Sequence, residues 1–429
     1  MRDHKQITLH SVEGFKTQLL AWAQQFEDIV WLDSNQYLQP HSSYDSILAV
    51  DAFTGIQTDY VNGFQKLKEY QSITNDWIFG YLSYDLKNDT EPLSSQNFDG
   101  LNFPDLCFFQ PKRLFLFRED KLTIRYLKVV SDEVDADLKS IETFSLQNNS
   151  SHKNDIQIES RISKKQYINK VSTLLSHIHR GDIYEANFCQ EFYAHAEINS
   201  LETYFKLNKI SQPPFATFLK TGDKYLLSSS PERYLKKVGL EIMSQPIKGT
   251  TRRSEHLEED ADLKTILESD PKERSENIMI VDLVRNDLSK IAQKGTVNVT
   301  ELCQIYSFKQ VHHMISTVQA KALPTILPVD IIAATFPMGS MTGAPKISAM
   351  KIIEALEATK RGLYSGTVGY FTPEGDFDFN VVIRSILYNA SKSYVSFSVG
   401  SAITSKSTPE NEYEECLVKA KAMRSVLEN

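Results

Sequence analysis

Residues 364–427 decide the fold class of this chain; they read YSGTVGYFTPEGDFDFNVVIRSILYNASKSYVSFSVGSAITSKSTPENEYEECLVKAKAMRSVL. Runs of β-branched and aromatic residues, bounded by turn residues, predict strands over 364–371, 379–388 and 393–399. A charged, Ala- and Leu-containing run predicts a closing helix over 409–427. Neighbouring strands thus follow one another without intervening helices.

The same mixture continues toward the N-terminus. Strands are predicted for WIFGYLSYDL (77–86), LCFFQPKRLFLF (106–117), IYEANFCQEFYAHA (183–196) and the turn-broken stretch 224–252. Helices are predicted over 163–181, 258–291 and 344–360. These elements alternate without a regular βαβ rhythm, so the chain is predicted to be α+β rather than a doubly wound parallel sheet.

Two of these elements carry specific local signals. Ser163 and Gln166 form a capping-box pair at the start of one helix, and Gly181 is placed to end it. In the strand that follows, period two puts Glu185 on the opposite face from Phe188.

Length and composition limit the function. The chain has 429 residues, 41% hydrophobic and 24% charged, with a net charge of −8. No Lys/Arg-rich run is present, so nucleic acid is not an expected partner. The four cysteines have no metal-binding spacing, and no apolar run is long enough for a signal peptide or a membrane helix. We therefore expect a cytoplasmic, enzyme-sized protein with no membrane partner.

The polar stretch 131–160 contrasts with its surroundings and predicts a linker or surface excursion. We place a division there, between an N-terminal domain over 1–155 and a second domain over 156–429.

Two predicted helices carry acidic pairs three residues apart. These are Glu273 and Glu276 in one helix and Glu412 and Glu415 in the other, with Lys419 one turn further on. Such spacing places each pair on one helix face. Two faces of this kind brought together could hold Mg²⁺, which binds oxygen ligands and typically takes one or two protein carboxylates. Each pair taken singly is better explained as a solvated helix face.

Three other places stand out by residue type. Lys248 lies at the Pro- and Gly-flanked turn PIKGT (246–250), where the backbone could approach a ligand closely. Taken alone, this residue is better explained as a solvated lysine in a surface turn. Arg384 lies in an apolar strand and needs a carboxylate partner from the protein or a ligand. The Gly-rich stretch MGSMTGAPKISAM (338–350) enters a helix but lacks the phosphate-binding frame G-x-x-x-x-G-K-[ST].

Seven stretches, taken together and in order, resemble the chorismate-utilising enzymes. This family includes anthranilate synthase component I, aminodeoxychorismate synthase component I, isochorismate synthase and salicylate synthase. The stretches are SSSPERY (228–234), PIKGT (246–250), ENIMIVDLVRNDL (276–288), GSMTGAPKISAM (339–350), RGLYSGTVGY (361–370), VVIRSIL (381–387) and PENEYEECLVKAKA (409–422). The resemblance implies two large antiparallel or mixed β-sheets packed as a sandwich, with helices outside. It also implies that residues 156–429 are the chorismate-binding catalytic domain.

The resemblance implies roles for individual residues. Magnesium would use Glu276 and Glu415, with Glu273 and Glu412 in support. Glu232 would be the general acid that protonates the departing C4 hydroxyl, because hydroxide is a poor leaving group. His313 matches a family histidine near the ring. The remaining substrate-binding positions are Gly249, Thr250, Tyr364, Arg384, Gly400 and Lys419.

Lys248 points to one branch of the family. Anthranilate synthases typically read P-I-A-G-T at this turn, whereas aminodeoxychorismate synthases read P-I-K-G-T. A lysine amine can attack C2 of chorismate as the C4 hydroxyl leaves, and ammonia can then attack C4 and expel the lysine from C2. This requires a neutral lysine, so we expect its pKa to be lowered by burial or by nearby magnesium. The resemblance is therefore nearest to aminodeoxychorismate synthase component I, in the route to 4-aminobenzoate and folate.

Three residues depart from the family pattern, one of them Met338, which replaces a common glycine or cysteine. Water-adding members carry lysine at the position of Glu185, and ammonia-using members usually carry glutamine. Ala402 stands where the family tail usually has glycine. The acidic Glu185 counts against isochorismate and salicylate synthesis.

No glutaminase signature is present, so a separate glutamine amidotransferase subunit is expected to supply ammonia. WLDSN (31–35) partly matches the family's tryptophan-binding element, and a purely structural strand explains it equally well. Two alternatives remain open: anthranilate synthase component I, and a non-catalytic relative that binds chorismate or an amino acid.

Overall fold

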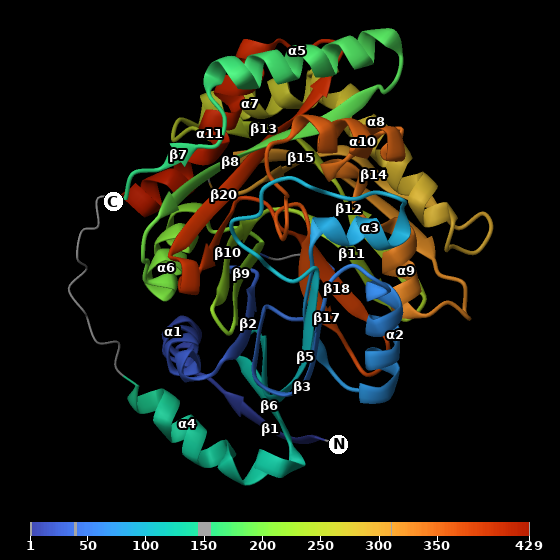
Figure 1. Ribbon diagram of the computed structural model, residues 1–429. Helices are drawn as coiled ribbons and strands as arrows, with labels where there is room; N and C mark the ends of the chain where they lie inside the picture. Colours follow the sequence, from blue (N-terminus) through green and yellow to red (C-terminus); the bar gives the residue numbers. More distant parts are fainter. Residues whose placement is uncertain (1, 38–40, 145–155, 310, 429) are drawn as a thin grey trace.

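Two antiparallel β-sheets diverge from a pair of long strands, β3 (Ser46–Thr58) and β5 (Leu106–Arg118) (Figure 1). The computed structural model describes residues 2–37, 41–144, 156–309 and 311–428. The first half of β3 pairs with β2. After an irregularity between Ala52 and Thr54, the second half of β3 pairs with the N-terminal part of β5, and that part of β5 also pairs with β4. One strand pair therefore belongs to both sheets.

The first sheet runs from the shared pair in both directions. On one side lie β6 (Lys121–Leu127) and β1 (Arg2–Thr8). On the other side follow β2 (Asp28–Asp33), β9 (Phe215–Thr221), β10 (Lys224–Ser230), β19 (Ser385–Asn389), β20 (Tyr394–Thr404) and β8 (Glu185–His195), with β7 (Glu159–Ser160) and β16 (Gly343–Ala344) on β8.

The second sheet begins where β4 (Ile78–Leu82) pairs with β5. It continues through β17 (Thr367–Phe371), β18 (Phe377–Val381), β11 (Arg233–Val238), β12 (Glu241–Gln245) and β15 (Val311–Lys321), on which β13 (Ile247–Arg252) and β14 (Asn298–Ser307) also pair.

The helices lie outside the sheets (Figure 1). They are α1 (Val12–Trp22), α2 (Gly63–Thr74), α3 (Lys87–Thr90), α4 (Val134–Thr143), α5 (Lys164–Arg180), α6 (Ser200–Ser211), α7 (Leu257–Ser269), α8 (Pro271–Ser289), α9 (Pro328–Thr335), α10 (Lys346–Leu356) and α11 (Pro409–Glu428). Short 3₁₀ turns occur at Ala23–Gln25, Tyr84–Leu86, Lys128–Glu133, Gly339–Met341 and Ala390–Lys392.

Two apolar layers hold this arrangement together. One lies between the sheets and includes Val30 and Leu226 of the first sheet with Phe79 and Phe379 of the second. The other lies between the first sheet and its outer helices, where residues of α1, α5, α6 and α11 pack on its second face. The first sheet is therefore buried on both faces, which explains its nearly continuous apolar sequences. The predicted α+β sandwich with helices outside is confirmed.

The local predictions are confirmed around α5 and β8. Ser163 and Gln166 form the reciprocal capping box, and Gly181 ends α5 in the left-handed conformation with φ 87°. In β8, Phe188 packs under the outer helices, while Glu185 belongs to the opposite face and contacts Lys248.

Two strand predictions are wrong, and the stretch predicted as a linker or surface excursion contains a helix. This helix, α4, is mostly exposed and is anchored by the buried Ile141 against the first sheet's outer layer. The strand predicted over 77–86 ends at Leu82 and gives way to a 3₁₀ turn. The strand predicted over 379–388 is broken in two, because Arg384 adopts a left-handed conformation with φ 50° between β18 and β19.

The two predicted domains share both sheets. Strand β2 pairs with β9, and β4 pairs with β17, so each sheet contains strands from before and after the predicted boundary. The boundary itself adjoins residues 145–155, which lie outside the described residues.

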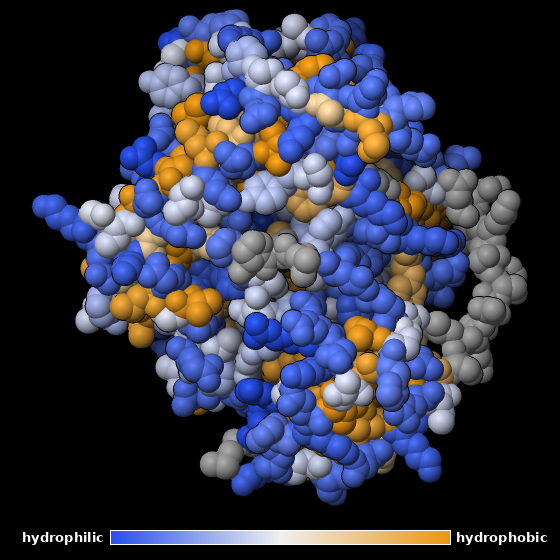
Figure 2. Space-filling model, turned by 180° about the vertical axis from the view of Figure 1, so that it is seen from behind, coloured by the Kyte–Doolittle hydropathy of each residue, from blue (hydrophilic) through white to orange (hydrophobic). Residues whose placement is uncertain are grey.

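Among the described helices, none combines the length and apolarity required to cross a lipid bilayer. One face of the molecule is mostly hydrophilic, with separate hydrophobic patches (Figure 2).

Candidate active site

Lys248 lies in a β-bulge, not in a free surface turn. Ile247 pairs with Ile315 and Thr250 with His313, so β13 has one residue more than β15 between these two pairs. Gly249 takes the left-handed conformation, φ 88°, that such a bulge requires. A Cβ at Gly249 would lie 3.2 Å from Glu273 Oε2. The bulge therefore turns the backbone toward the acidic helix α8.

The ammonium of Lys248 forms a buried ion pair with Glu185 of β8. The Nζ to Oε1 distance is 2.9 Å, and 11% and 1% of the two side chains are exposed. Burial acts to lower the pKa of Lys248, but Glu185, Glu276 and Glu232 outweigh it, so that the pKa is raised. The expectation of a lowered pKa is therefore wrong for the resting site, because three carboxylates face this amine. Glu185 Oε2 is buried without a hydrogen-bond partner in the described part of the chain.

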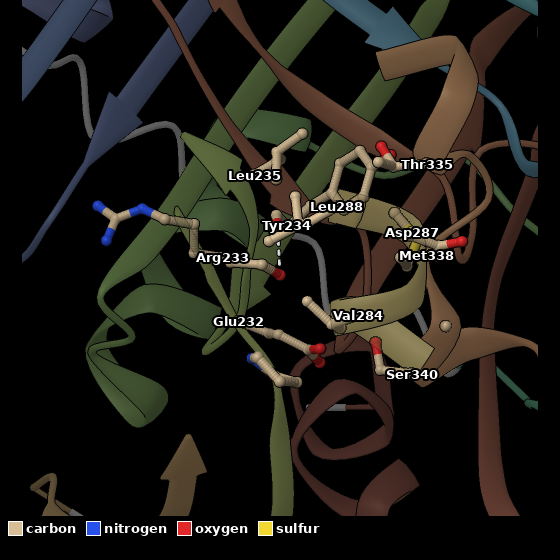
Figure 3. A pocket seen from close by; sticks show the side chains of 13 residues that line it. Glu232, Arg233, Tyr234, Leu235, Val284, Asp287, Leu288, Thr335, Met338 and Ser340 are labelled. Carbon is tan, nitrogen blue, oxygen red and sulfur yellow. Dashed lines mark hydrogen bonds between the residues drawn. The ribbon is translucent and has the colours of Figure 1, made fainter. Parts of the chain in front are cut away.

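Glu232 is a buried carboxyl group suited to donate a proton at neutral pH. It follows β10, and only 4% of it is exposed. Burial raises its pKa to about 7, against the opposing effects of the Ser340 hydroxyl and of Lys248. Figure 3 shows its carboxyl group directed toward Ser340 at the edge of a cavity between β11, α8 and the Gly339–Met341 turn. Its half-protonated state near pH 7 fits a general acid.

Arg384 places a cation close to Glu232. The strand break described above holds Arg384 at the left-handed position between β18 and β19. Burial lowers its pKa, and Glu232 acts in the opposite direction. No hydrogen bond or ion pair of its guanidinium is found within the described ranges. The buried guanidinium therefore has hydrogen-bond donors that a carboxylate could satisfy.

His313 lies beside the bulge. Its Nδ1 is 2.8 Å from Thr250 Oγ1, and its buried Nε2 has no partner among the described residues. Burial, with the nearby Arg384, holds the pKa of His313 well below its ordinary value. The imidazole is therefore neutral.

The two predicted acidic helices do meet. Lys272 Nζ lies 3.9 Å from Glu276 Oε1 on α8 and 3.8 Å from Glu412 Oε1 on α11. Glu415 is paired with Lys419 at 2.7 Å, and that ammonium also donates to the carbonyl of Gly400 at 2.9 Å.

The electrostatics of this cluster favour a cation. Burial raises the pKa of Glu276 to about 7, and Glu273 adds to the effect against Lys248 and Lys272. Glu276 Oε1 and Glu412 Oε2 are buried without hydrogen-bond partners in the described chain. Such orphaned oxygens fit a hard cation. The described residues contain no group of three acidic, histidine or cysteine side chains close enough to bind a metal by themselves.

Tyr364 and Gly400 form a neighbouring wall around Cys189. Cys189 Sγ donates to the Tyr364 hydroxyl at 3.6 Å, and Gly400 pairs with Cys189 across β20 and β8. A Cβ at Gly400 would lie 2.5 Å from that sulfur, so only glycine fits. No hydrogen bond or cation–π contact joins Tyr364 to Arg384 within the described residues.

Two contributors were missed from the sequence. Lys272 lies one helical turn from Glu276, and this i,i+4 spacing was the available signal. Ser340 had no signal, because its approach to Glu232 depends on how the Gly-rich loop packs.

A second cavity lies between the sheets. Its lining includes Asp33 and Ser34, from the partial match to the tryptophan-binding element, with Arg233 and Asp378. Asp33 Oδ1 already accepts from Ser46 at 2.8 Å and Lys16 at 3.2 Å. A role for this cavity in binding tryptophan stays a prediction.

Comparison with known proteins identifies the family. The chorismate binding enzyme family matches residues 27–425. The chain belongs to this family. A probable aminodeoxychorismate synthase from Oryza sativa is 35% identical over 403 residues, covering 84% of this chain and 44% of that protein. Anthranilate synthase component 1 from Thermus thermophilus is 32% identical over 361 residues, covering 82% and 77%. The chain thus spans less than half the length of the plant protein.

A solved structure agrees with these matches. Anthranilate synthase component I from Streptococcus pneumoniae superposes with a TM-score of 0.77 at 27% identity, covering 90% of this chain and 93% of the other. The chorismate-binding enzyme thus has relatives of comparable similarity in two branches of its family.

Proposed function

We propose that this enzyme is aminodeoxychorismate synthase component I, which converts chorismate and ammonia to 4-amino-4-deoxychorismate. The observation that carries the proposal is Lys248. It is held in a bulge, paired with Glu185 and electrostatically coupled to Glu232 and Glu276. A buried lysine facing a proton donor suits covalent catalysis better than structural support.

Arg384 is the proposed receptor for one chorismate carboxylate. It is a guanidinium beside Glu232 that lacks a protein partner among the described side chains. Binding there would bring the C4 hydroxyl toward the Glu232 carboxyl group.

The first displacement forms a bond between Lys248 Nζ and C2. Glu185 Oε1, at 2.9 Å, is the nearest acceptor for the proton that Lys248 must lose. As the amine attacks C2, the ring double bond shifts and the C4–O bond breaks. Glu232 supplies a proton to the departing oxygen, which leaves as water.

The second displacement restores the enzyme. Ammonia attacks C4, the double bond shifts back, and the bond between C2 and Nζ breaks. The excess proton on the new ammonium group returns to Glu232. Two successive displacements retain the configuration at C4.

Glu276 and Glu415 are the proposed Mg²⁺ ligands. Glu273 and Glu412 are proposed to support the site, mostly through water. The orphaned carboxylate oxygens of this cluster support the assignment. Bound Mg²⁺ would neutralise a substrate carboxylate. Lys419 would lie close to the same group.

A separate amidotransferase subunit is the proposed source of ammonia. The component I designation of the Thermus and Streptococcus relatives supports a multi-subunit arrangement. The route toward 4-aminobenzoate and folate is proposed on the same grounds.

Product identification tests the function. The purified chain is incubated with chorismate, Mg²⁺ and an ammonium salt at mildly alkaline pH, and products are resolved by mass. We expect a product that retains the enolpyruvyl group and yields 4-aminobenzoate when a lyase is added. Lys248→Ala should abolish that product. Undiminished output from this variant would refute the covalent role.

Anthranilate synthase component I is the second candidate, because relatives of that branch match at similar identity over more of their length. Anthranilate with free pyruvate as products would establish it. No turnover with or without the amidotransferase would favour a non-catalytic binding protein instead.

A further inference from the structure

One lysine occupies the space between the two acidic helices. Lys272 Nζ lies 3.9 Å from Glu276 Oε1 and 3.8 Å from Glu412 Oε1. Both distances are longer than a hydrogen bond, so the ammonium is shared between two carboxylates without satisfying either. Two buried oxygens of these carboxylates, Glu276 Oε1 and Glu412 Oε2, have no hydrogen-bond partner in the described structure.

The helix itself does not favour a cation at this position. Asp270 caps α8 by accepting from the backbone N–H groups of Lys272 and Glu273 at 2.8 and 2.9 Å. Lys272 therefore lies in the first turn, where the helix dipole repels positive charge. Of its side chain, 38% is exposed, so an extended path to water is open. The carboxylates, not the helix, hold the ammonium inward.

The Lys419 ammonium is held by hydrogen bonds, whereas that of Lys272 is not held by any within the described chain. Lys419 is hydrogen-bonded to Glu415 Oε1 at 2.7 Å and to the Gly400 carbonyl at 2.9 Å. It is fixed at two points on α11 and β20. Among the described residues, Lys272 has ion pairs only with Glu276 and Glu412, both at 3.8–3.9 Å, so it is held less firmly than Lys419.

We propose that Lys272 is a built-in counter-ion, which fills the cation site of the metal-free enzyme and moves to solvent when Mg²⁺ binds. This inference rests on the Mg²⁺ site of the proposed function. It assigns Lys272 two effects. It keeps the acidic faces of α8 and α11 together without metal, and it competes with Mg²⁺ for them.

Direct Mg²⁺ binding tests the inference without using catalysis. Mg²⁺ is titrated by calorimetry into the full chain, without chorismate, for the wild type, Lys272→Gln and Lys272→Arg. Lys264→Gln is the matched control, because it removes the same charge from an exposed position on α7. Melting temperatures are recorded in chelator and at saturating Mg²⁺.

We expect Lys272→Gln to bind Mg²⁺ about tenfold more tightly than the wild type, equivalent to ~1.4 kcal/mol. Lys272→Arg and Lys264→Gln should bind as the wild type does. In chelator, Lys272→Gln should melt at a lower temperature, because unscreened carboxylates repel, and Mg²⁺ should restore the loss.

Three other results would contradict the proposal. Equal Mg²⁺ affinity in Lys272→Gln and the wild type would overturn the counter-ion role and leave the metal site intact. Weaker binding in Lys272→Gln would also overturn it, by making Lys272 a helper of the metal. Absence of Mg²⁺ binding in every variant, with or without chorismate, would overturn both the metal site and this inference.

Discussion

Replacing Glu232 with glutamine should change both catalysis and the pH dependence of stability. The substitution keeps the shape of a buried side chain while removing its proton equilibrium. The folded-state pKa of about 7 stands against an ordinary value of 4.5. A shift of that size corresponds to about 3 kcal/mol of differential stability between the two protonation states.

The sign follows from the raised pKa. Below pH 4.5 the carboxyl group is protonated in both folded and unfolded chains. Between pH 4.5 and 7 the unfolded chain has lost the proton while the folded chain keeps it, so stability falls as pH rises. Above pH 7 the folded enzyme carries an unfavourable buried charge. Glu232→Gln should therefore gain up to about 3 kcal/mol relative to the wild type between pH 5 and pH 8.

Urea unfolding at pH 5 and pH 8 measures this difference. Glu268→Gln is the matched control, because Glu268 is exposed on α7 and should give no pH-dependent difference. Glu232→Gln should also lower kcat by ~10²–10⁴-fold, since no proton donor remains for the leaving hydroxyl. In the wild type, kcat/KM should fall as pH rises above about 7, where Glu232 loses its proton.

An identical stability difference at pH 5 and pH 8 would refute the reasoning. It would mean that Glu232 titrates normally, so that its burial does not prepare it to donate a proton near neutral pH. Retained kcat in Glu232→Gln would independently exclude it as the general acid.

Three further substitutions test the neighbouring contacts. Lys248→Arg keeps a charge beside Glu185 but cannot become a neutral nucleophile, so product formation should fall at least ~10³-fold while chorismate binding, measured by calorimetry, changes little; unchanged turnover would contradict this. Glu185→Gln should lower the pKa of Lys248, because Glu185 raises it, and the pH dependence of Lys248 acetylation followed by mass spectrometry measures the shift; an unaltered profile would show that the ion pair does not control the amine. Gly249→Ala should lose ~1–3 kcal/mol of unfolding free energy in urea, since its φ of 88° is strained for alanine and its Cβ would press on three neighbours at 3.2 Å. Gly239→Ala is its control and should lose less, because at φ 59° the added Cβ would have no atom of the described residues within 4 Å. Equal losses would remove the steric part of the argument.

Local signals in the sequence were read correctly where one short segment contains all the information. The capping box of Ser163 and Gln166 and the two-faced strand around Glu185 need only nearest-neighbour chemistry. The left-handed break at Arg384 was not foreseen, because Val, Ile and Leu on both sides favour a continuous strand. The sequence pattern does not predict helix α4, because Ile141 is its one buried residue in the described structure and most of the others are polar.

The sequence by itself determined the fold class, the family resemblance and the identity of the charged residues. These depend on period, spacing and residue type, which a linear chain displays. It could not determine the protonation of Lys248, since burial and carboxylate attraction oppose each other and only their geometry decides the balance.

The tertiary structure decided which charges meet. Helices α8 and α11, far apart in the chain, bring Glu276 and Glu412 within 3.9 Å and 3.8 Å of the Lys272 ammonium. β8 and the bulge of β13 likewise bring Glu185 to Lys248. Electrostatic energies depend on distance through space and on exclusion of water, and neither quantity exists until the sheets and helices have packed.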